Sequence, residues 1–295
     1  MKRILAVLIL LFLANTTCCN CANANFVTDK KNQIIEAHNK NVAKSEIKKL
    51  IKKQTKLVQK YDLNGLSALY SKDFVSSDGF GKDVYFKLIE DTWKSYPDIT
   101  YTTEIKDIKI NGNDAQVSSY ETSVATAVER TENATAFGEL NSYSNGVYYL
   151  KKNNDKWQFT GEKIDDEKTF LKYGDTRFVK MDLETPKNVK AGEYYTASLT
   201  IDAPENTFFM ASINRDEITY PQEKSEEVFR KVSSDNILER MFLANKSGKN
   251  EYNVASVGMT KAEFLPANKV KLYIAGVAFV MTRVNVENAG EKNAK

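Results

Sequence analysis

The sequence has 295 residues, of which 42% are hydrophobic and 27% are charged, values typical of a folded globular protein. A chain of this length is long enough for two domains of ordinary size. The formal net charge is +3, and this near-neutral total excludes the general basic excess expected of a nucleic-acid-binding protein.

The first 24 residues are typical of an export signal. Lys2 and Arg3 form a positive region, an apolar run of 11 residues follows from Ile4 to Ala14, and Ala22-Asn23-Ala24 offers small residues to a signal peptidase. The apolar run is too short to span a bilayer, which takes about 20 residues. We therefore expect residues 1–24 to be a signal peptide and the protein to be exported, periplasmic or extracellular. Loss of two positive charges would leave the mature chain at +1.

All three cysteines, Cys18, Cys19 and Cys21, follow this apolar run. Cleavage after Ala24 would remove them. The alternative is a lipidated cysteine, with Cys18 as the candidate, that anchors the protein to a bacterial membrane. The preceding Asn15-Thr16-Thr17 is a poor lipobox. Under either alternative the folded part contains no disulfide and no thiolate metal site.

Residues 25–43 are polar, which predicts a tether or a loose helix with the only histidine, His38, exposed on it. Ser45 is a candidate N-cap for the helix that follows. Stepping 100° per residue places the apolar side chains of this helix on one face and its lysines on the other. The apolar positions are Ile47, Leu50, Ile51, Leu57, Val58 and Tyr61, and the lysines are Lys48, Lys49, Lys52, Lys53, Lys56 and Lys60. The lysines form a solvated face or a patch for anionic lipid head groups.

Two more helices and a sheet are expected next. Leu66, Leu69 and Tyr70 indicate a short helix, and Asp83 begins a third helix that Pro97 ends. An antiparallel meander of four strands follows, at Tyr101–Ile110, Ala115–Ala127, Phe137–Leu150 and Lys156–Thr160.

This order of elements resembles the nuclear transport factor 2-like superfamily, which includes SnoaL-type and ketosteroid-isomerase-type proteins. The resemblance covers residues 44–172 and is carried by Leu66…Leu69-Tyr70…Phe74, Ile105…Ile108-Lys109-Ile110, Gly112…Asp114-Ala115-Gln116-Val117, Gly146-Val147-Tyr148-Tyr149-Leu150 and Lys156-Trp157-Gln158-Phe159. It implies a cone in which helices pack on a bent sheet, with a mouth that holds a small apolar ligand or a protein partner. It also makes a homodimer through the outer sheet face plausible. The candidate ligand-binding residues are Tyr85, Trp93, Tyr96, Tyr120, Glu121, Tyr143 and Tyr148.

The rest of the chain predicts a second domain. Asp165 to Gly174 is expected to be a linker, and we place the domain boundary at residues 173–177. Short alternating segments in residues 178–289 predict an antiparallel β-sandwich of immunoglobulin-like architecture. The insert Arg215–Asn236 carries a charged segment, Glu223–Lys231, that we expect to be a helix. Residues 290–295 are expected to be a disordered tail. The predicted fold class is therefore α+β, a cone followed by an all-β sandwich.

The sequence shows no signature of cofactor or metal chemistry. It contains no GxGxxG and no GxxxxGK[ST], and a serine triad would need a histidine inside the fold. Only carboxylate or tyrosine acid–base chemistry survives, with Glu104 and Glu121 as candidates. The absence of these catalytic motifs favours an exported, non-catalytic protein that binds a small apolar ligand or an envelope protein. The alternatives are a proton-transfer isomerase or dehydratase, and a structural component of an envelope assembly.

Overall fold

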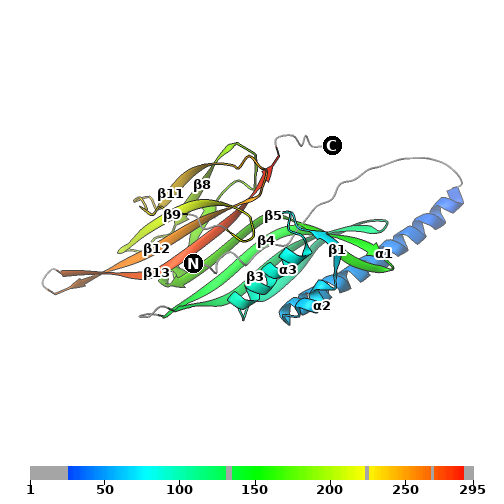
Figure 1. Cartoon of the computed structure of the whole chain (residues 1–295), viewed down its shortest axis with the longest axis horizontal. Coiled ribbons are helices and arrows are strands. Elements are labelled where there is room, and N and C mark those ends of the chain that lie inside the picture. The colour runs from blue at the N-terminus through cyan, green and yellow to red at the C-terminus, as the bar shows by residue number, and fades with distance from the viewer. Residues whose placement is uncertain (1–25, 131–134, 223–225, 267–268, 289–295) are drawn as a thin grey trace.

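The computed structural model describes residues 26–130, 135–222, 226–266 and 269–288 (Figure 1). Strands predominate over helices in the described part of the chain. The expected signal peptide, with Cys18, and the expected tail at residues 290–295 lie outside the described residues. Within the described part, no helix is both long and apolar enough to cross a membrane.

Three helices precede the main sheet: α1 (Phe26–Gln59), α2 (Leu63–Ser67) and α3 (Lys82–Ser95). The tether alternative for residues 25–43 is wrong, because α1 already begins at Phe26 and carries an exposed His38. Ser45 is therefore inside the helix and does not cap it. The physical reason is that α1 contains no Gly or Pro to interrupt it.

The other two helices have clear local causes. The Asp62 carboxylate caps α2 by accepting a hydrogen bond from the Gly65 N–H at 2.8 Å. The helix α3 ends at Ser95, two residues before Pro97, in agreement with the predicted stop. Tyr70, expected in the short helix, instead begins a strand.

One ten-stranded sheet extends through both halves of the chain, with the strand order β10-β9-β12-β13-β5-β4-β3-β2 (Figure 1). In addition, β1 pairs with β5 and β7 with β13, both in parallel. The strands are β1 (Tyr70–Val75), β2 (Thr100–Asn111), β3 (Asp114–Arg130), β4 (Thr135–Asn153), β5 (Lys156–Gly174), β7 (Asn188–Lys190), β9 (Thr207–Glu217), β10 (Arg230–Lys231), β12 (Glu251–Leu265) and β13 (Lys269–Glu287). All four strands of the predicted meander are confirmed, as β2 to β5, and each is longer than expected.

The linker expected at Asp165–Gly174 is wrong. These residues are the second half of β5, and residues 168–174 pair with residues 276–282 of β13. Glu167, Thr169, Leu171 and Tyr173 are buried in strict alternation with more exposed neighbours. This alternation is not visible in the acidic sequence Asp165-Asp166-Glu167. Glu167 occupies a buried position but is a polar residue type, so the sequence does not show the apolar–polar pattern that predicts a strand. Past Gly174 the chain turns into the short 3₁₀ helix η1 (Asp175–Phe178).

A second sheet of three strands, β11-β8-β6, packs on the C-terminal half of the large sheet. Its strands are β6 (Met181–Glu184), β8 (Tyr194–Ile201) and β11 (Ile237–Leu243). The shared core contains Leu183, Ala197 and Leu199 from this sheet and Ala211, Val257 and Val280 from the large one. Nothing further identifies this half as immunoglobulin-like, which stays a prediction.

Two further expectations in this half are wrong. The described part of the charged segment, residues 226–231, contains no helix, and Arg230–Lys231 forms β10 at the edge of the sheet, opposite Met210 and Ala211. The last of the expected short segments are replaced by one long strand, β13, whose register shifts opposite the Met259–Thr260 step of β12. Tertiary pairing overrides the local pattern at both places.

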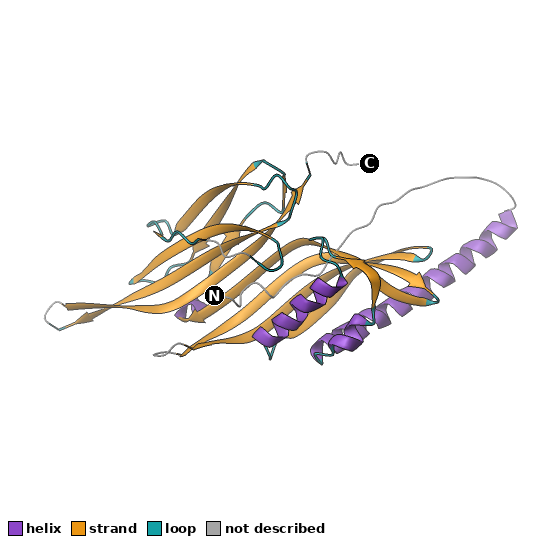
Figure 2. Ribbon diagram, in the orientation of Figure 1, coloured by secondary structure: helices purple, strands orange, loops and turns teal. Residues whose placement is uncertain are grey.

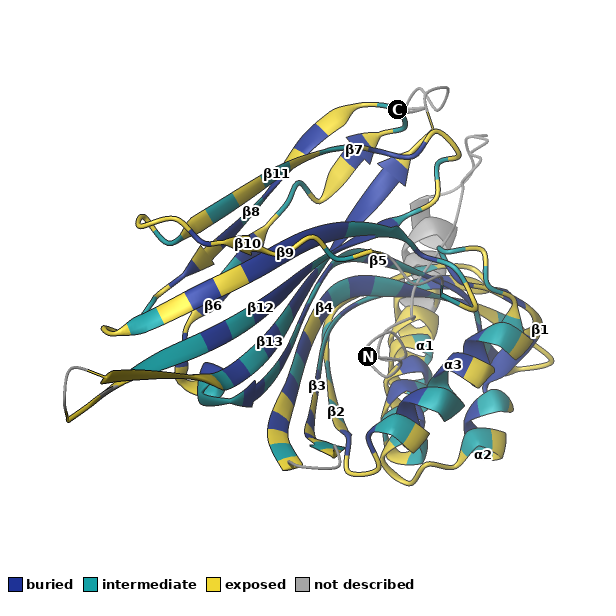
Figure 3. Ribbon diagram, turned by 60° about the vertical axis from the view of Figure 1, so that its left-hand side comes forward, coloured by how far each residue is buried: buried dark blue, intermediate teal, exposed yellow. Residues whose placement is uncertain are grey.

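The helices lie on one face of the curved sheet, where they cover its N-terminal half (Figures 2 and 3). The core between them is rich in aromatic side chains, with Tyr70 stacked on Phe159 at a centroid distance of 4.7 Å and Tyr85 close to Phe74. This layered half is the part that the sequence resemblance predicted as a cone.

Candidate active site

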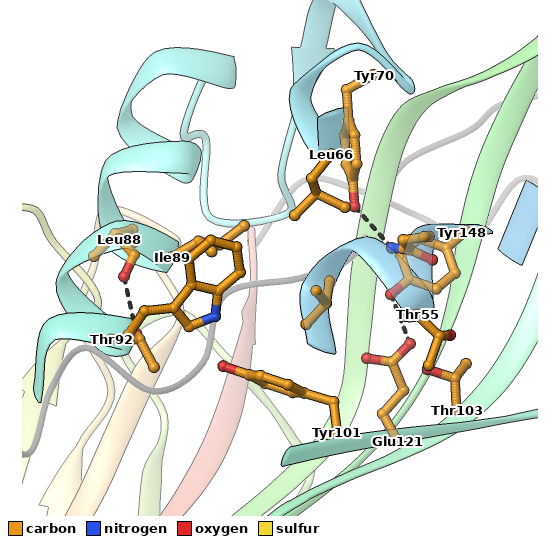
Figure 4. A pocket seen from close by; sticks show the side chains of 13 residues that line it. Thr55, Leu66, Tyr70, Leu88, Ile89, Thr92, Tyr101, Thr103, Glu121 and Tyr148 are labelled. Atoms are coloured by element: carbon orange, nitrogen blue, oxygen red, sulfur yellow. Dashed lines mark hydrogen bonds between the residues drawn. The ribbon is translucent and has the colours of Figure 1, made fainter. Parts of the chain in front are cut away.

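A cavity of about 50 Å³ lies between the three helices and the strands β2, β3 and β4 (Figure 4). Its wall is mostly apolar, with a few polar groups. The lining residues are Gln54, Thr55, Val58, Leu66, Tyr70, Leu88, Ile89, Thr92, Trp93, Tyr101, Thr103, Glu121 and Tyr148. An apolar cavity with few convergent polar groups is the usual form of a small-molecule site.

The carboxyl group of Glu121 is the one acidic group in this wall. Glu121 lies on β3, and the Tyr148 hydroxyl on β4 donates a hydrogen bond of 2.6 Å to its Oε1 (Figure 4). Burial raises the pKa of Glu121 to about 7, an increase that the hydrogen bond from Tyr148 opposes. A carboxyl with a pKa close to neutral can both accept and release a proton under ordinary conditions.

Two other polar groups in the wall have incomplete hydrogen bonding. Gln54 donates from its Nε2 to the Tyr70 hydroxyl at 2.8 Å, but its buried Oε1 has no partner among the described residues. The buried indole Nε1 of Trp93 also lacks a partner there. Buried polar groups are normally satisfied, so this acceptor and this donor are available to a polar ligand.

The structure brings together three of the seven side chains expected in a pocket, namely Trp93, Glu121 and Tyr148. Tyr85 and Tyr96 are fully buried in the core instead, and the Tyr85 hydroxyl donates to the Glu162 carboxyl at 2.8 Å. Tyr120 and Tyr143 lie outside the cavity, because successive side chains of a strand point to opposite faces. Tyr120 directly precedes Glu121, which lines the cavity, and Tyr143 directly follows the buried Ser142. Tyr120 contacts Lys106, and Tyr143 packs on Phe170.

Glu104, the other carboxylate candidate, is outside the cavity. Its side chain is mainly exposed and forms an ion pair of 2.7 Å with Lys106. Glu104 pairs with Tyr120 across β2 and β3, whereas Thr103 pairs with Glu121. The period of two therefore separates the two candidate carboxylates onto opposite faces of the sheet.

Sequence reasoning did not identify Gln54, Tyr101 or Thr103. A signal for Gln54 exists, because it falls on the apolar face of α1, three residues after Ile51 and four before Val58. Tyr101 and Thr103 lie on the strand that pairs with Glu121, at positions of the same alternation. Their signal becomes visible only when the register of β2 and β3 is known.

A second polar cluster is buried between the N-terminal half and β13. Arg283 on β13 forms an ion pair with Asp78, in the loop before α3, and both side chains are essentially inaccessible. Burial raises the pKa of Glu167 to about 8, and the Tyr252 hydroxyl donates to this carboxyl at 3.1 Å. Burial also raises the pKa of Glu162 well above its ordinary value. None of these groups lines the cavity beside Glu121, and we assign them to the packing of the two halves.

Among the described residues, no group of three or more His, Cys, Asp or Glu side chains is placed to hold a metal ion.

Comparisons with known proteins find solved structures that are similar to less than half of this chain. A protein assigned as a scytalone dehydratase from Novosphingobium aromaticivorans matches with 17% identity and a TM-score of 0.37, over 43% of this chain and 86% of that one. A hexachlorocyclohexane dehydrochlorinase from Novosphingobium barchaimii matches with 13% identity and a TM-score of 0.33, over 43% and 88%. A protein of the NTF2-like family from Streptomyces avermitilis, assigned as a dehydratase, matches with 10% identity and a TM-score of 0.34, over 42% and 95%.

No protein-family model matches the sequence, and no curated protein matches it. The structural neighbours are thus NTF2-like and SnoaL-like folds that cover about 43% of the chain.

Proposed function

We propose that the protein binds a small, largely apolar molecule in the cavity and that Glu121 moves a proton on it. The observation that carries this proposal is the Glu121 carboxyl, which lies in an apolar wall, is held by Tyr148 and has a pKa of about 7. A surface glutamate would be ionised at neutral pH and would make a weak base. Desolvation increases the basicity of Glu121.

The chemistry that fits is proton transfer next to a carbonyl group. Because Oε1 of Glu121 accepts from Tyr148, Oε2 is the oxygen left to take a proton from the carbon next to the carbonyl. The electron pair of the broken C–H bond forms an enolate, whose oxygen can accept from the Trp93 N–H. Return of the proton from Oε2 to the same carbon gives proton exchange and restores the carboxylate. In a substrate whose carbon–carbon double bond is conjugated with the enolate, return to the far carbon of the dienolate shifts that double bond and completes an isomerisation.

Proton exchange with solvent tests this proposal without knowledge of the natural substrate. The probe is 2-hexanone in D2O, with incorporation of deuterium next to the carbonyl followed by NMR. We expect the wild-type protein to accelerate exchange. The acceleration by Glu121→Gln should be smaller by a factor of at least about 100. Glu104→Gln is the matched control, because it removes an exposed carboxylate on the opposite sheet face.

Equal exchange rates for the wild-type protein and Glu121→Gln would refute the proton-transfer role. Binding of the ketone without exchange would return the protein to the class of non-catalytic ligand-binding proteins. Export through residues 1–24 and an envelope location remain part of the proposal and are checked by N-terminal sequencing of the secreted protein.

A further inference from the structure

A groove of about 330 Å³ lies between α1 and β2, on the flank of the cavity. It is lined by Lys48, Ile51, Lys52, Thr55, Lys56, Gln59, Thr103 and Ile105. Thr55 and Thr103 line both the groove and the cavity, so these two hollows adjoin at the two threonines. Figure 4 shows both threonines next to Glu121. A molecule lying across the two threonines would have one end beside Glu121 and the other end in the groove.

The groove is positively charged. Lys48, Lys52 and Lys56 are exposed and follow one another at intervals of four residues, so they form one row along α1. None of them forms an ion pair with a described residue, and no carboxylate lines the groove. Like charges four residues apart destabilise a helix, so this row lowers the stability of α1 in the absence of an anion.

The wider charge distribution points the same way. The sequence of α1 contains nine lysines and three acidic residues, a net charge of +6, against +3 for the whole chain. The remaining residues therefore sum to −3. Positive charge is thus concentrated on the element that borders the cavity, where it attracts anions to the groove.

We infer that the substrate is a small organic anion whose charged group binds to Lys48, Lys52 and Lys56 while its uncharged, carbonyl-bearing end enters the cavity. This inference rests on the proposed function and specifies its substrate class. The anionic group has to stay in the groove, because burial beside the Glu121 carboxyl would cost desolvation and repulsion. Carboxylate and phosphate are both compatible with three lysines.

Binding of a matched pair of probes tests the inference. The probes are 5-oxohexanoate and its methyl ester, which differ in the negative charge and in one added methyl group. Their Kd values are measured by NMR titration of the full chain at low and high salt. We expect the acid to bind at least about tenfold more tightly than the ester at low salt, with a smaller difference at high salt.

The groove variant is Lys48→Gln/Lys52→Gln/Lys56→Gln, and the control is Lys49→Gln/Lys53→Gln/Lys60→Gln, which removes the same charge outside the groove. The groove variant should raise the Kd of the acid about tenfold and leave that of the ester unchanged. The control should change either Kd less than twofold.

Three results would overturn the inference: equal Kd values for acid and ester, equal effects of the two triple variants, or a loss of ester binding in the groove variant. Failure of the proposed function is distinguishable, because it appears as unchanged proton exchange in Glu121→Gln and does not involve the lysines. If the protein binds the acid more tightly than the ester but does not accelerate proton exchange, it is an anion-binding, non-catalytic protein.

Discussion

At the scale of single residues, Glu121 combines two opposing influences. Its carboxyl lies in an apolar wall that disfavours the charged form, and the Tyr148 hydroxyl bonds to it and favours that form. The net result is a pKa of about 7. The unfolded chain would hydrate this carboxyl fully and return its pKa to 4.5, so folding and protonation of Glu121 are linked.

The sign of this linkage gives a testable prediction. Because folding raises the pKa, Glu121 contributes stability that is fully present below pH 4.5 and is lost as the pH rises through about 7. In Glu121→Gln this pH-dependent contribution is absent. From pH 5 to pH 8 the unfolding free energy of the wild type should therefore fall relative to that of the variant, by on the order of 3 kcal/mol at most.

Urea denaturation of both proteins at pH 5 and pH 8 measures the effect. Glu104→Gln is again the control, since its exposed carboxylate faces solvent. Parallel pH dependence of the wild type and Glu121→Gln would contradict the raised pKa. Glu167 titrates in both proteins and cancels in the comparison, whereas the pKa of Glu162 is raised in part by the Glu121 charge and is lower in the variant.

At the scale of elements, the corner at the end of β5 depends on glycine. Gly174 has a φ of 61°, a backbone conformation that L side chains rarely adopt, and it pairs with Gly276 of β13. A Cβ at Gly174 would collide with the backbone carbonyl oxygen of Ala275. Both obstacles are in the backbone, so rotation of a side chain cannot relieve them.

We therefore expect Gly174→Ala to lower the unfolding free energy by more than about 2 kcal/mol. Gly112→Ala is the matched control, because Gly112 also has a positive φ, of 58°, but nothing lies within 4 Å of an added Cβ. The control should lose about 1 kcal/mol. Chemical denaturation measures both, and equal losses would show that the β5–β13 contact does not restrict position 174.

At the scale of the whole molecule, the two halves of the chain share one sheet and one buried ion pair. β5 of the N-terminal half pairs with β13 of the C-terminal half through seven residue pairs. Arg283 of β13 reaches Asp78 in the loop before α3, and the Asn250 side chain also donates to Asp78 at 2.8 Å. Contacts of this kind predict that the halves unfold together.

Asp78→Ala tests this coupling. It leaves the buried Arg283 charge without its carboxylate, and we expect a loss of about 3–5 kcal/mol in unfolding free energy. Glu90→Ala is the control, because it breaks exposed ion pairs with Lys87 and Lys94 and should have little effect.

The loss should appear in a single transition. Fluorescence of Trp93 and Trp157 reports on the N-terminal half, and far-ultraviolet circular dichroism reports on both halves. Coincident curves would support joint unfolding, and two separate transitions would contradict it.

The sequence by itself determined the local elements of the N-terminal half. Helical spacing located the packed part of α1 and α3, and alternation located β2, β3 and β4, since these patterns depend on neighbours in the chain. It also identified Glu121, Tyr148 and Trp93 as candidates, though without a reason to choose Glu121 over Glu104.

Only the tertiary structure decided between those carboxylates and united the two halves. The choice depends on the β2–β3 register, which places Thr103 and not Glu104 opposite Glu121. The continuity of the sheet depends on β5 pairing with β13, more than 100 residues away. A hydrophobicity pattern assigns charged residues such as Glu167 and Arg283 to the surface. They are buried here because partners that are distant in the sequence satisfy them in the interior.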